Sequence, residues 1–394
     1  MNRKIRYFLI LFILIIQNNL SQVNLSVYSE ISIVTAGPGE ELYEKFGHSA
    51  IRVKDPVLNL DLIYNYGVFD FEAPNFLLNF AQGKMYYLLA RYDFKYFLAS
   101  YQKDKRWLKQ QVLNLNQNEK QQFFNYLENN ALPENATYLY DPFFDNCATK
   151  LRDITKEVLG NTYAFNTEKI QKNKTLRSLM NQEIHWNTWG NFGINLIAGT
   201  ILDKERSQLE YMYLPDYVYQ VFKHSTIQRD DTFVDLVKKE EVLLNFDEIP
   251  QDATLFSPLN VFIILLLIVA FVTYRDVKFK KRSKYLDFTI FFTTGFVGCI
   301  LAYLWLFSSH TTAPNNFNIL WAFAPNLIVA FLLLKKKIRM WLRAYILTLL
   351  ILLLAVPFLW ILEMQLFSMA FIPLFLILFV RYLFLYKYLL ASKK

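Results

Sequence analysis

The chain has 394 residues, of which 54% are apolar and 19% are charged. An ordinary soluble domain has about 45–50% apolar and about 25% charged residues, so this composition excludes a disordered or collagen-like chain and indicates contact with lipid. The formal net charge is +8, and the cysteines are Cys147 and Cys299. Two cysteines are too few for a disulfide framework or for a metal site made of several cysteines.

The first residues of the chain have the pattern of a secretion signal. Three cations precede the apolar run Tyr7–Ile16, and the polar stretch Gln17–Ser21 follows it. This order is typical of signal peptides, although no strict small-x-small cleavage site is present. We therefore predict a signal peptide over residues 1–21, with an uncleaved signal anchor as the alternative. Both interpretations export the residues that follow.

Two regions of different composition come after the signal. Residues 22–256 mix charged, aromatic and apolar residues, without the roughly 18 unbroken apolar residues of a spanning helix. Residues 257–394 contain five apolar runs, each close to the roughly 20 residues that cross a bilayer. The predicted spans are Asn260–Tyr274 with its flanks, which is the shortest, Phe288–Phe307, Phe317–Leu334, Ala344–Leu362 and Leu366–Leu385. We expect an exported domain followed by an all-α membrane domain of about five transmembrane helices.

The loops between the spans indicate the orientation of the chain. Lys and Arg are abundant after the first span, after the third span and at the C-terminus, whereas the other two loops have none. Under the positive-inside rule, this alternation predicts a cytoplasmic C-terminus, and five spans then predict a periplasmic N-terminal domain. We expect a multi-pass protein of the bacterial inner membrane. Because an exported domain does not meet nucleic acid, the basic charge does not indicate a nucleic-acid partner.

Strands and helices are both predicted in the exported domain. Gly47–Val53 alternates in polarity as a strand does, and Leu60–Tyr66 is a second strand beyond a turn. A hairpin of these two strands would bring His48 opposite about Tyr64–Tyr66. Helices are predicted over Gln117–Asn130, Asp145–Gly160 and much of Arg206–His224.

The segment around Cys147 is the sharpest local signal. Asp145 or Asn146 suits the N-cap of a helix, and apolar residues then recur at helical spacing from Cys147 onward. In the first turn of a helix, unpaired N–H groups and the helix dipole lower the pKa of a thiol. The competing interpretation is a buried, inert cysteine. An oxidising exported compartment favours a catalytic role for this thiol, because Cys299 lies in a predicted span and is not available as a disulfide partner.

His48 is the best candidate for the general base. A lone histidine at a strand end is more often structural, but His48 and Cys147 form the only plausible pair of nucleophile and base in this domain. His185 and His224 are weaker candidates. A catalytic base also needs a residue that orients it. The candidates are Asn65 and Tyr66 on the paired strand, with Asp61 and Asp145 as alternatives.

The order of these features resembles that of circularly permuted papain-like enzymes, in which the histidine strand precedes the cysteine helix. The closer resemblance is to the Bacteroidota lipoprotein N-acyltransferases, over most of residues 30–225. Its carrying segments are Gly47–Ala50, Tyr64–Phe71, Pro74–Phe76, Asp145–Cys147, Thr175–Arg177, Asp203 and Leu214–Asp216. The resemblance implies an α+β domain of permuted papain-like fold. Arg177, Trp186 and Asp203 also match motifs of this family, and packing is the favoured interpretation for them.

The resemblance also implies an activity. A fatty acyl chain would move from a membrane phospholipid to the α-amino group of a diacylglyceryl-cysteine lipoprotein, with Cys147 as nucleophile and His48 as base. The oxyanion hole would use the Cys147 backbone N–H and one side chain, for which Asn146 or Asn65 is the candidate. Because a thioester can acylate an amine unaided, no cofactor, nucleotide or metal is expected. The expected partners are a phospholipid, a lipoprotein and the membrane.

Two other classes of function compete with acyl transfer. A membrane-anchored cysteine peptidase or amidase acting on cell-wall peptides would use the same pair of residues and would need the membrane domain only as an anchor. A transporter or sensor with an exported binding domain is the non-enzymatic alternative. The near absence of charged residues within the predicted spans argues weakly against transport, since transport paths usually need them.

Overall fold

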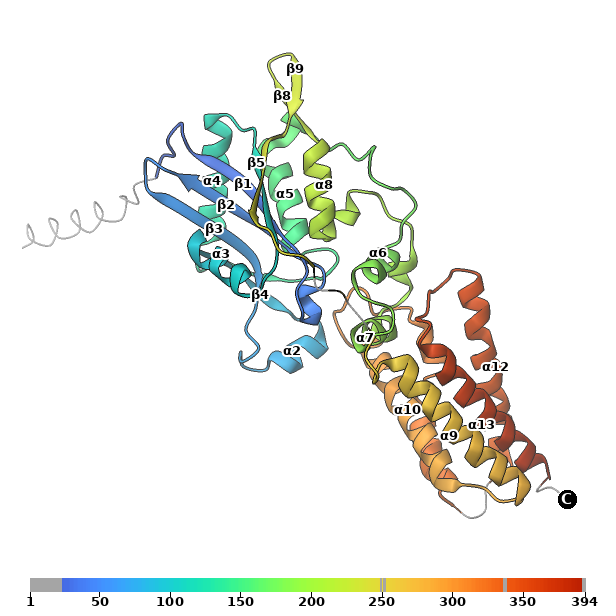
Figure 1. Cartoon of the computed structure of the whole chain (residues 1–394). Helices are drawn as coiled ribbons and strands as arrows, with labels where there is room; N and C mark the ends of the chain where they lie inside the picture. Colours follow the sequence, from blue (N-terminus) through green and yellow to red (C-terminus); the bar gives the residue numbers. More distant parts are fainter. Residues whose placement is uncertain (1–22, 249, 251–252, 336–338, 392–394) are drawn as a thin grey trace, which may run out of the picture.

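The computed structural model describes residues 23–248, 250, 253–335 and 339–391. The predicted secretion signal, residues 1–21, lies outside the described residues. Figure 1 shows an α+β domain at the N-terminal side and a bundle of helices at the C-terminal side. This arrangement confirms the predicted fold class, an α+β domain followed by an all-helical membrane domain.

A seven-stranded antiparallel sheet forms the centre of the first domain, with strand order β10-β5-β1-β2-β3-β4-β6. Both predicted strands are present as β2 and β3, and each runs two residues further than predicted. The strands are β1 (Glu30–Ala36), β2 (His48–Asp55), β3 (Leu60–Val68), β4 (Tyr86–Asp93), β5 (Leu108–Leu113), β6 (Thr137–Leu139) and β10 (Val237–Leu244).

The sheet is covered on both faces because side chains alternate along its strands. Ile31 and Ile33 of β1 pack into the larger core with α4, α5 and α8, whereas Val34 and Ala36 pack with α3 on the other face. These helices are α3 (Phe94–Lys103), α4 (Gln117–Asn130), α5 (Cys147–Leu159) and α8 (Pro215–His224). Smaller elements are α2 (Phe76–Gln82), α6 (Leu176–Glu183), α7 (Trp189–Ile197), β7 (Tyr163–Ala164), β8 (Thr226–Arg229) and β9 (Thr232–Asp235).

The predicted helices match this arrangement, with one difference. Gln117–Asn130 is α4, and the helix predicted from Asp145 begins at Cys147 as α5. The stretch predicted as one helix near Arg206–His224 is divided into a short 3₁₀ helix at Glu210–Tyr213 and α8. Pro215 explains the division, because proline lacks the N–H that continues a helix but suits its first position.

Among the described residues, four helices are long and apolar enough to cross a membrane. They are α9 (Pro258–Lys278), α10 (Lys284–Leu306), α12 (Trp341–Ile361) and α13 (Phe371–Ala391). The predicted third span instead contains a 3₁₀ helix at Phe317–Leu320 and the short α11 (Asn326–Leu333). Pro325 lies between them and interrupts the α-helical hydrogen bonding.

The interrupted third segment still passes along the whole bundle. At one end, the Asn318 side chain donates to the Leu196 carbonyl of the α+β domain, and at the other the Leu333 carbonyl accepts from Arg282 in the loop after α9. Gly295 and Gly298 of α10 allow close approach, since a Cβ at Gly295 would lie 2.0 Å from the Leu327 backbone nitrogen. Within the described residues, the chain therefore passes along the bundle five times, and the third passage is not a continuous helix.

Buried charges join three of the helices, where the sequence indicated almost none. Arg381 of α13 is fully buried and contacts Asp287 of α10 at 2.5 Å and Asp276 of α9 at 2.8 Å. Arg282 contacts the other oxygen of Asp287 at 2.8 Å. Two arginines and two aspartates thus neutralise one another at the ends of α9 and α10 that lie away from the sheet.

The loop between α10 and the third segment packs against the α+β domain. The Gly199 amide donates to the Thr312 carbonyl at 2.7 Å, and the Asn316 side chain donates to the Leu196 carbonyl at 2.7 Å. A Cβ at Gly199 would overlap the Pro314 carbonyl, so the two backbones are in direct contact. These bonds fix the sheet domain to the membrane domain.

A buried ion pair strengthens the same junction. The Arg177 guanidinium lies 2.8 Å from Asp203 and also donates to Asn195 and to the backbone of Ala198. Asp203 accepts in turn from the Leu366 amide, which lies between α12 and α13. These contacts agree with the packing interpretation of Arg177 and Asp203.

Candidate active site

The candidate site lies where two neighbouring strands of the sheet separate. β2 and β3 pair from Asp55 with Leu60 as far as Ile51 with Tyr64, and no pairing between them continues beyond Ile51 among the described residues. The remaining part of β2 stays with β1, and the remaining part of β3 stays with β4. The two strands diverge here, and His48 and the residues after Tyr64 lie at the resulting opening between their backbones.

His48 and Asn65 face each other across this opening. The Nε2 atom of His48 lies 2.6 Å from Oδ1 of Asn65, so the ring nitrogen donates to the amide oxygen. The Asn65 amide nitrogen donates to the Tyr92 hydroxyl on β4 at 3.2 Å. The amide is therefore held in the orientation that presents its oxygen to the imidazole. Nδ1 is then the ring nitrogen that remains available to the thiol.

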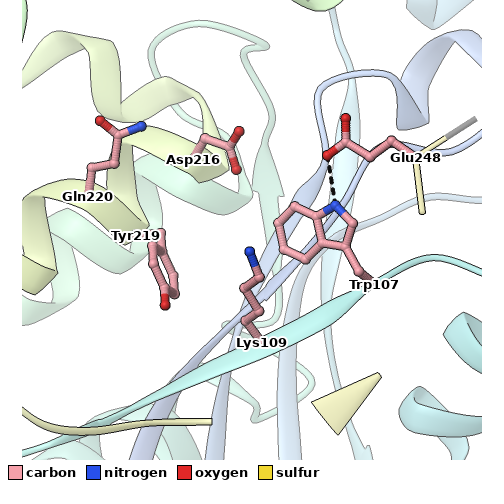
Figure 2. A pocket seen from close by; sticks show the side chains of 6 residues that line it. All are labelled: Trp107, Lys109, Asp216, Tyr219, Gln220 and Glu248. Carbon is pink, nitrogen blue, oxygen red and sulfur yellow. Dashed lines mark hydrogen bonds between the residues drawn. The ribbon is translucent and has the colours of Figure 1, made fainter. Parts of the chain in front are cut away.

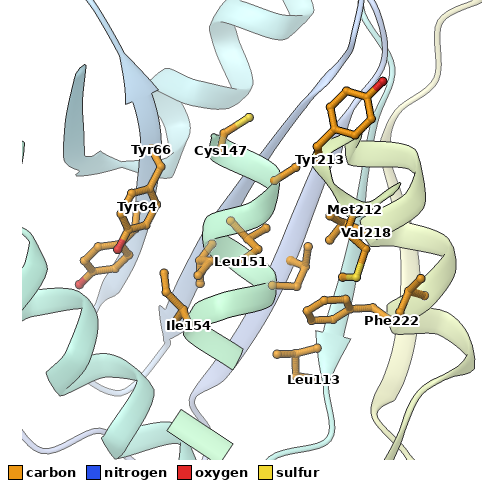
Figure 3. Packing of buried hydrophobic residues seen from close by; sticks show 14 of the residues in the cluster. Tyr64, Tyr66, Leu113, Cys147, Leu151, Ile154, Met212, Tyr213, Val218 and Phe222 are labelled. Carbon is orange, nitrogen blue, oxygen red and sulfur yellow. The ribbon is translucent and has the colours of Figure 1, made fainter. Parts of the chain in front are cut away.

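The position of Cys147 follows from the cap of α5. The Asn146 side-chain oxygen accepts from the amides of Ala148 and Thr149, each at 2.9 Å. The cap does not use the amide of Cys147. Apolar residues of α5 pack into the larger core, and Figure 3 shows Leu151 and Ile154 there with Cys147 at the end of the same helix. The packing of α5 on the sheet thus carries the thiol to the opening between β2 and β3.

The thiol and the imidazole change each other's protonation. Burial raises the pKa of the Cys147 thiol, but the charge and hydrogen bond of His48 and the amides of Ser49 and Ala148 lower it, and the net shift is downward. Burial lowers the pKa of His48, whereas the Cys147 charge, its hydrogen bond and Asn65 raise it, and the net shift is upward. Opposite shifts of this kind favour a thiolate and imidazolium pair.

Gly67 lies beside the nucleophile. Its φ is +90°, and a Cβ there would lie 3.6 Å from Cβ of Cys147 and 3.5 Å from the Tyr140 ring. A larger residue would be strained and would place its side chain beside the thiol. The Tyr138 hydroxyl lies 3.9 Å from the same position, and its proton has no acceptor among the described residues.

The other residues singled out from the sequence lie in different surroundings. The Tyr66 hydroxyl accepts from Asn130 of α4, which directs it into the core rather than toward His48. The Asn146 amide nitrogen donates to the carbonyls of Pro142 and Tyr213, each at 2.8 Å. The remaining contacts are those of Asp61 with Arg52, of Asp145 with Lys150 and of His185 with the Asn187 amide, while Cys299 lies exposed on α10.

A separate hollow of about 260 Å³ lies between β5, α8 and the segment after β10. Figure 2 shows Lys109 beside Trp107, and its ammonium lies 4.4 Å from the centre of the indole. The Trp107 indole N–H donates to Glu248 at 2.8 Å. Neither Cys147 nor His48 lines this hollow. Among the described residues, no group of three or more His, Cys, Asp or Glu is arranged to hold a metal ion.

Two family models match the chain. The model of the Lnb N-terminal periplasmic domain matches residues 19–182, which include His48, Asn65 and Cys147. The model of the Lnb transmembrane domain matches residues 250–394. A periplasmic α+β domain fixed to a helical membrane domain thus defines a membrane-anchored protein. The chain belongs to the Lnb family, which confirms the resemblance seen in the sequence. No curated protein and no solved structure shows a significant match to the chain.

Three contributors to the site were not recognised in the sequence. Tyr92 holds Asn65, the Ser49 amide contacts the sulfur, and Tyr138 places its hydroxyl near Gly67. Gly67, a fourth residue beside the site, did leave a signal, as the glycine that ends the predicted strand. Tyr92 and Tyr138 lie on β4 and β6, whose positions depend on pairing with distant strands, and no local pattern indicates such pairing.

Proposed function

We propose that this protein is a thiol-dependent acyltransferase that moves a fatty acyl chain from a phospholipid to the α-amino group of a diacylglyceryl-cysteine lipoprotein. The arrangement of Cys147, His48 and Asn65 at the divergent ends of β2 and β3 is the observation that carries the proposal. Membership of the Lnb family supports it. The proposal assigns residues 22–256 to the catalytic domain and 257–394 to the membrane domain.

The first half-reaction forms a thioester. The Cys147 thiolate attacks the carbonyl carbon of a glycerol ester, and a tetrahedral intermediate carries the negative charge on the former carbonyl oxygen. The carbon–oxygen bond to glycerol then breaks. The His48 imidazolium gives its proton to the leaving oxygen, so a lysophospholipid departs and the acyl chain remains on sulfur. General acid help of this kind contributes roughly 10²–10⁴-fold to a rate.

The second half-reaction uses the same two residues with their roles exchanged: Cys147 is now the leaving group, and His48 is now the base. The lipoprotein amine attacks the thioester carbonyl, neutral His48 takes a proton from the amine, and the carbon–sulfur bond breaks to restore the Cys147 thiolate. The product is an amide, and the proton held by His48 restores the starting ion pair. Asn65 keeps Nε2 of His48 engaged through both steps, so that Nδ1 stays directed at the reacting atoms.

The oxyanion requires donors close to the nucleophile. The Cys147 amide suits this task because the Asn146 cap uses the next two amides and not this one. Asn146 has both amide protons engaged by carbonyls, so we assign it a positioning role. We assign the second donor to the Tyr138 hydroxyl. Burial, followed by the Cys147 charge, raises the pKa of Tyr138, which keeps the phenol protonated as a donor requires.

The proposed topology follows the charges of the loops. The chain passes through the bundle five times, so a periplasmic α+β domain requires the opposite end of the chain to face the cytoplasm. The loop with Lys280 and Lys281 would lie on that side, and the loop with Ser309 and His310 would lie in the periplasm. The membrane concerned would be the inner membrane, where a donor phospholipid and a lipoprotein acceptor share one leaflet.

Incubation of the purified full-length protein with diacyl phospholipid alone tests this function. Intact-mass measurement should find one acyl group on Cys147, and neutral hydroxylamine should release it. Addition of a diacylglyceryl-cysteine peptide should discharge the thioester and yield an N-acylated peptide that hydroxylamine does not cleave. Cleavage of a cell-wall peptide, without an acyl adduct under any lipid condition, would instead support the peptidase alternative.

A further inference from the structure

The segment after the catalytic strand β3 carries an apolar surface that no part of the described chain covers. α2 has the sequence Phe-Leu-Leu-Asn-Phe-Ala-Gln, with no charged residue and no buried residue. Leu77 is 79% exposed, and Leu78, Phe80 and the preceding Phe71 are also exposed. Exposed apolar residues in a contiguous group indicate a partner, since single ones are normal but clusters are not. We call these four residues the α2 foot.

The end of α2 is bonded to the membrane domain. The Ser309 amide donates to the Gln82 carbonyl at 2.8 Å, and the His310 ring donates to the Phe80 carbonyl at 2.8 Å. A Cβ at Gly83 would lie 2.5 Å from the His310 nitrogen, so the backbones touch. Ser309 follows the end of α10 by only three residues, and the side chains of Leu306 and Phe307 are exposed there.

These bonds determine the depth of the α2 foot along the membrane normal. α10 has 23 residues and, at about 1.5 Å per residue, is long enough to cross the roughly 30 Å of hydrocarbon. Its end therefore lies at the boundary between hydrocarbon and headgroups, and the bonded end of α2 lies at the same boundary. Figure 1 shows α2 on the side of the sheet domain that faces the bundle, opposite the β8–β9 hairpin.

A row of rings connects the foot with the nucleophile. Phe76 of α2 stacks on Phe69 at 6.2 Å between ring centres, Phe69 stacks on Tyr87 at 4.9 Å, and Tyr87 stacks on Tyr140 at 4.3 Å. Tyr140 lies against Gly67, and Gly67 lies against Cys147. The row thus connects the exposed helix to the residues beside the thiol by direct ring contacts.

The loop that precedes Cys147 is held at the same level. The Asp141 side chain accepts from the Thr311 hydroxyl at 2.5 Å, and its other oxygen accepts from the amides of Phe143 and Phe144. One loop of the membrane domain, residues 308–316, therefore contacts both α2 and the segment before the nucleophile. Both ends of the row of rings are fixed relative to the bilayer.

We propose that the α2 foot is immersed in the periplasmic leaflet of the membrane and that the row of rings behind it guides an acyl chain from this leaflet to Cys147. The occupant of the foot is the lipid, because the foot is continuous with the exposed apolar end of α10 and has no charge that would select a protein partner. Interfacial helices bury their apolar face about 5–10 Å into the boundary region. The guiding role rests on the proposed acyl transfer, whereas the immersion of the foot does not.

Spin labels test the immersion independently of activity. The full-length protein with Cys147→Ser and Cys299→Ser would carry a nitroxide at Leu77→Cys or, as the matched control, at Phe233→Cys in lipid nanodiscs. Phe233 is 61% exposed on the β8–β9 hairpin at the far end of the domain. The label at position 77 should collide more with oxygen than with a water-soluble nickel chelate, and the label at 233 should do the reverse. Equal access of nickel to both labels would overturn the immersion.

A second measurement tests the guiding role. Leu77→Asp with Leu78→Asp should lower thioester formation from phospholipid vesicles at least tenfold and leave acylation by a short-chain, water-soluble ester within twofold, because only the lipid donor needs the foot. Phe233→Asp should change neither rate. An equal loss with both donors would overturn the guiding role. A third outcome is that the wild type forms no thioester with phospholipid although the label at position 77 is immersed. That result would contradict the proposed acyl transfer and would leave the immersion of the α2 foot supported.

Discussion

Nε2 of His48 lies 2.6 Å from Oδ1 of Asn65, although the two strands that carry them have stopped pairing at this point. The side-chain hydrogen bond takes the place of the backbone bonds that a continued ladder would have made. It leaves Nδ1 directed toward Cys147 and raises the pKa of His48. In the proposed mechanism, the orientation of the base therefore depends on an amide that lies where the strand pairing ends.

Replacing Asn65 should change the pH dependence of thioester formation. In the wild type, Asn65 raises the pKa of His48, so the imidazolium that protonates the leaving oxygen persists to higher pH. Asn65→Ala removes this effect, and the alkaline limb of the profile should move to lower pH. Hydrogen bonds to charged groups contribute about 1.5–3 kcal/mol, so the maximum rate should fall roughly 10- to 150-fold.

Tyr92→Phe is the matched control for this experiment. It removes only the bond that holds the Asn65 amide nitrogen and leaves the oxygen beside His48. Its effect on the rate should be several-fold smaller, with a smaller shift of the alkaline limb in the same direction. The shift is read from single-turnover rates of thioester formation between pH 5 and 10. An unshifted limb in Asn65→Ala would contradict the assigned role.

The nucleophile and the base should behave as one unit. Cys147→Ala should abolish thioester formation, and His48→Ala should reduce it by roughly 10²–10⁴-fold, because proton transfer is lost while the thiol remains. The double variant should be no slower than Cys147→Ala, since residues that act together are strongly non-additive. Cys299→Ser should retain near-normal turnover. Near-normal turnover of Cys147→Ala would exclude the covalent mechanism.

Tyr138→Phe should lower the activity of the protein without lowering its stability. Removal of an oxyanion donor typically lowers kcat by about 10²–10³-fold, and KM should change little because the charge develops only in the transition state. The free energy of unfolding should stay the same or rise, since the hydroxyl proton has no acceptor within the part of the chain that the structure describes. Steady-state kinetics and thermal melting of the same preparation measure both quantities. A stable variant with unchanged kcat would remove Tyr138 from the mechanism.

The residues that the sequence identified are those with strong local signals. Cys147 was placed correctly in the first turn of a helix because the cap and the apolar spacing lie within a few residues of it. The sequence could not show whether Asn65 or Tyr66 orients His48. The answer depends on which face of β3 each side chain occupies, at a point where β3 has separated from β2. The bond of Tyr66 with Asn130 joins residues 64 positions apart. A contact of this kind has no local sequence signal.

The membrane domain also has features that local sequence patterns do not predict. Hydropathy averaged over a window identified the third passage, but it did not reveal that Pro325 and the buried Asn318 and Asn326 break its helix. These asparagines are satisfied by partners far away in the chain, such as the Tyr345 hydroxyl, which donates to Asn326 at 2.5 Å. The balanced charges around Arg381 were equally invisible, because Asp276 and Asp287 lie just outside the predicted spans and no local pattern indicates that their side chains are buried.

The charges around Arg381 should stabilise the bundle as a group. Arg381→Leu leaves Asp276 without its arginine and leaves Asp287 with Arg282 alone, all in a buried environment. Removal of one partner from a buried ion pair costs about 3–5 kcal/mol, mostly because an uncompensated charge remains. Arg381→Leu should therefore lower the melting temperature of the detergent-solubilised protein clearly, whereas Arg275→Leu on the exposed face of α9 should have little effect.

A double variant that removes both Arg381 and Asp287 tests most directly whether these charges act together. Arg381→Leu with Asp287→Leu removes one charge of each sign, so it should be more stable than Arg381→Leu alone, although Asp276 and Arg282 then remain to neutralise each other less directly. The candidate active site lies in the other domain, so the thioester yield of folded Arg381→Leu protein should stay close to that of the wild type. Melting by intrinsic tryptophan fluorescence and the acylated fraction of the folded pool measure the two effects. Additive losses in the double variant would show that the charges do not act as a network.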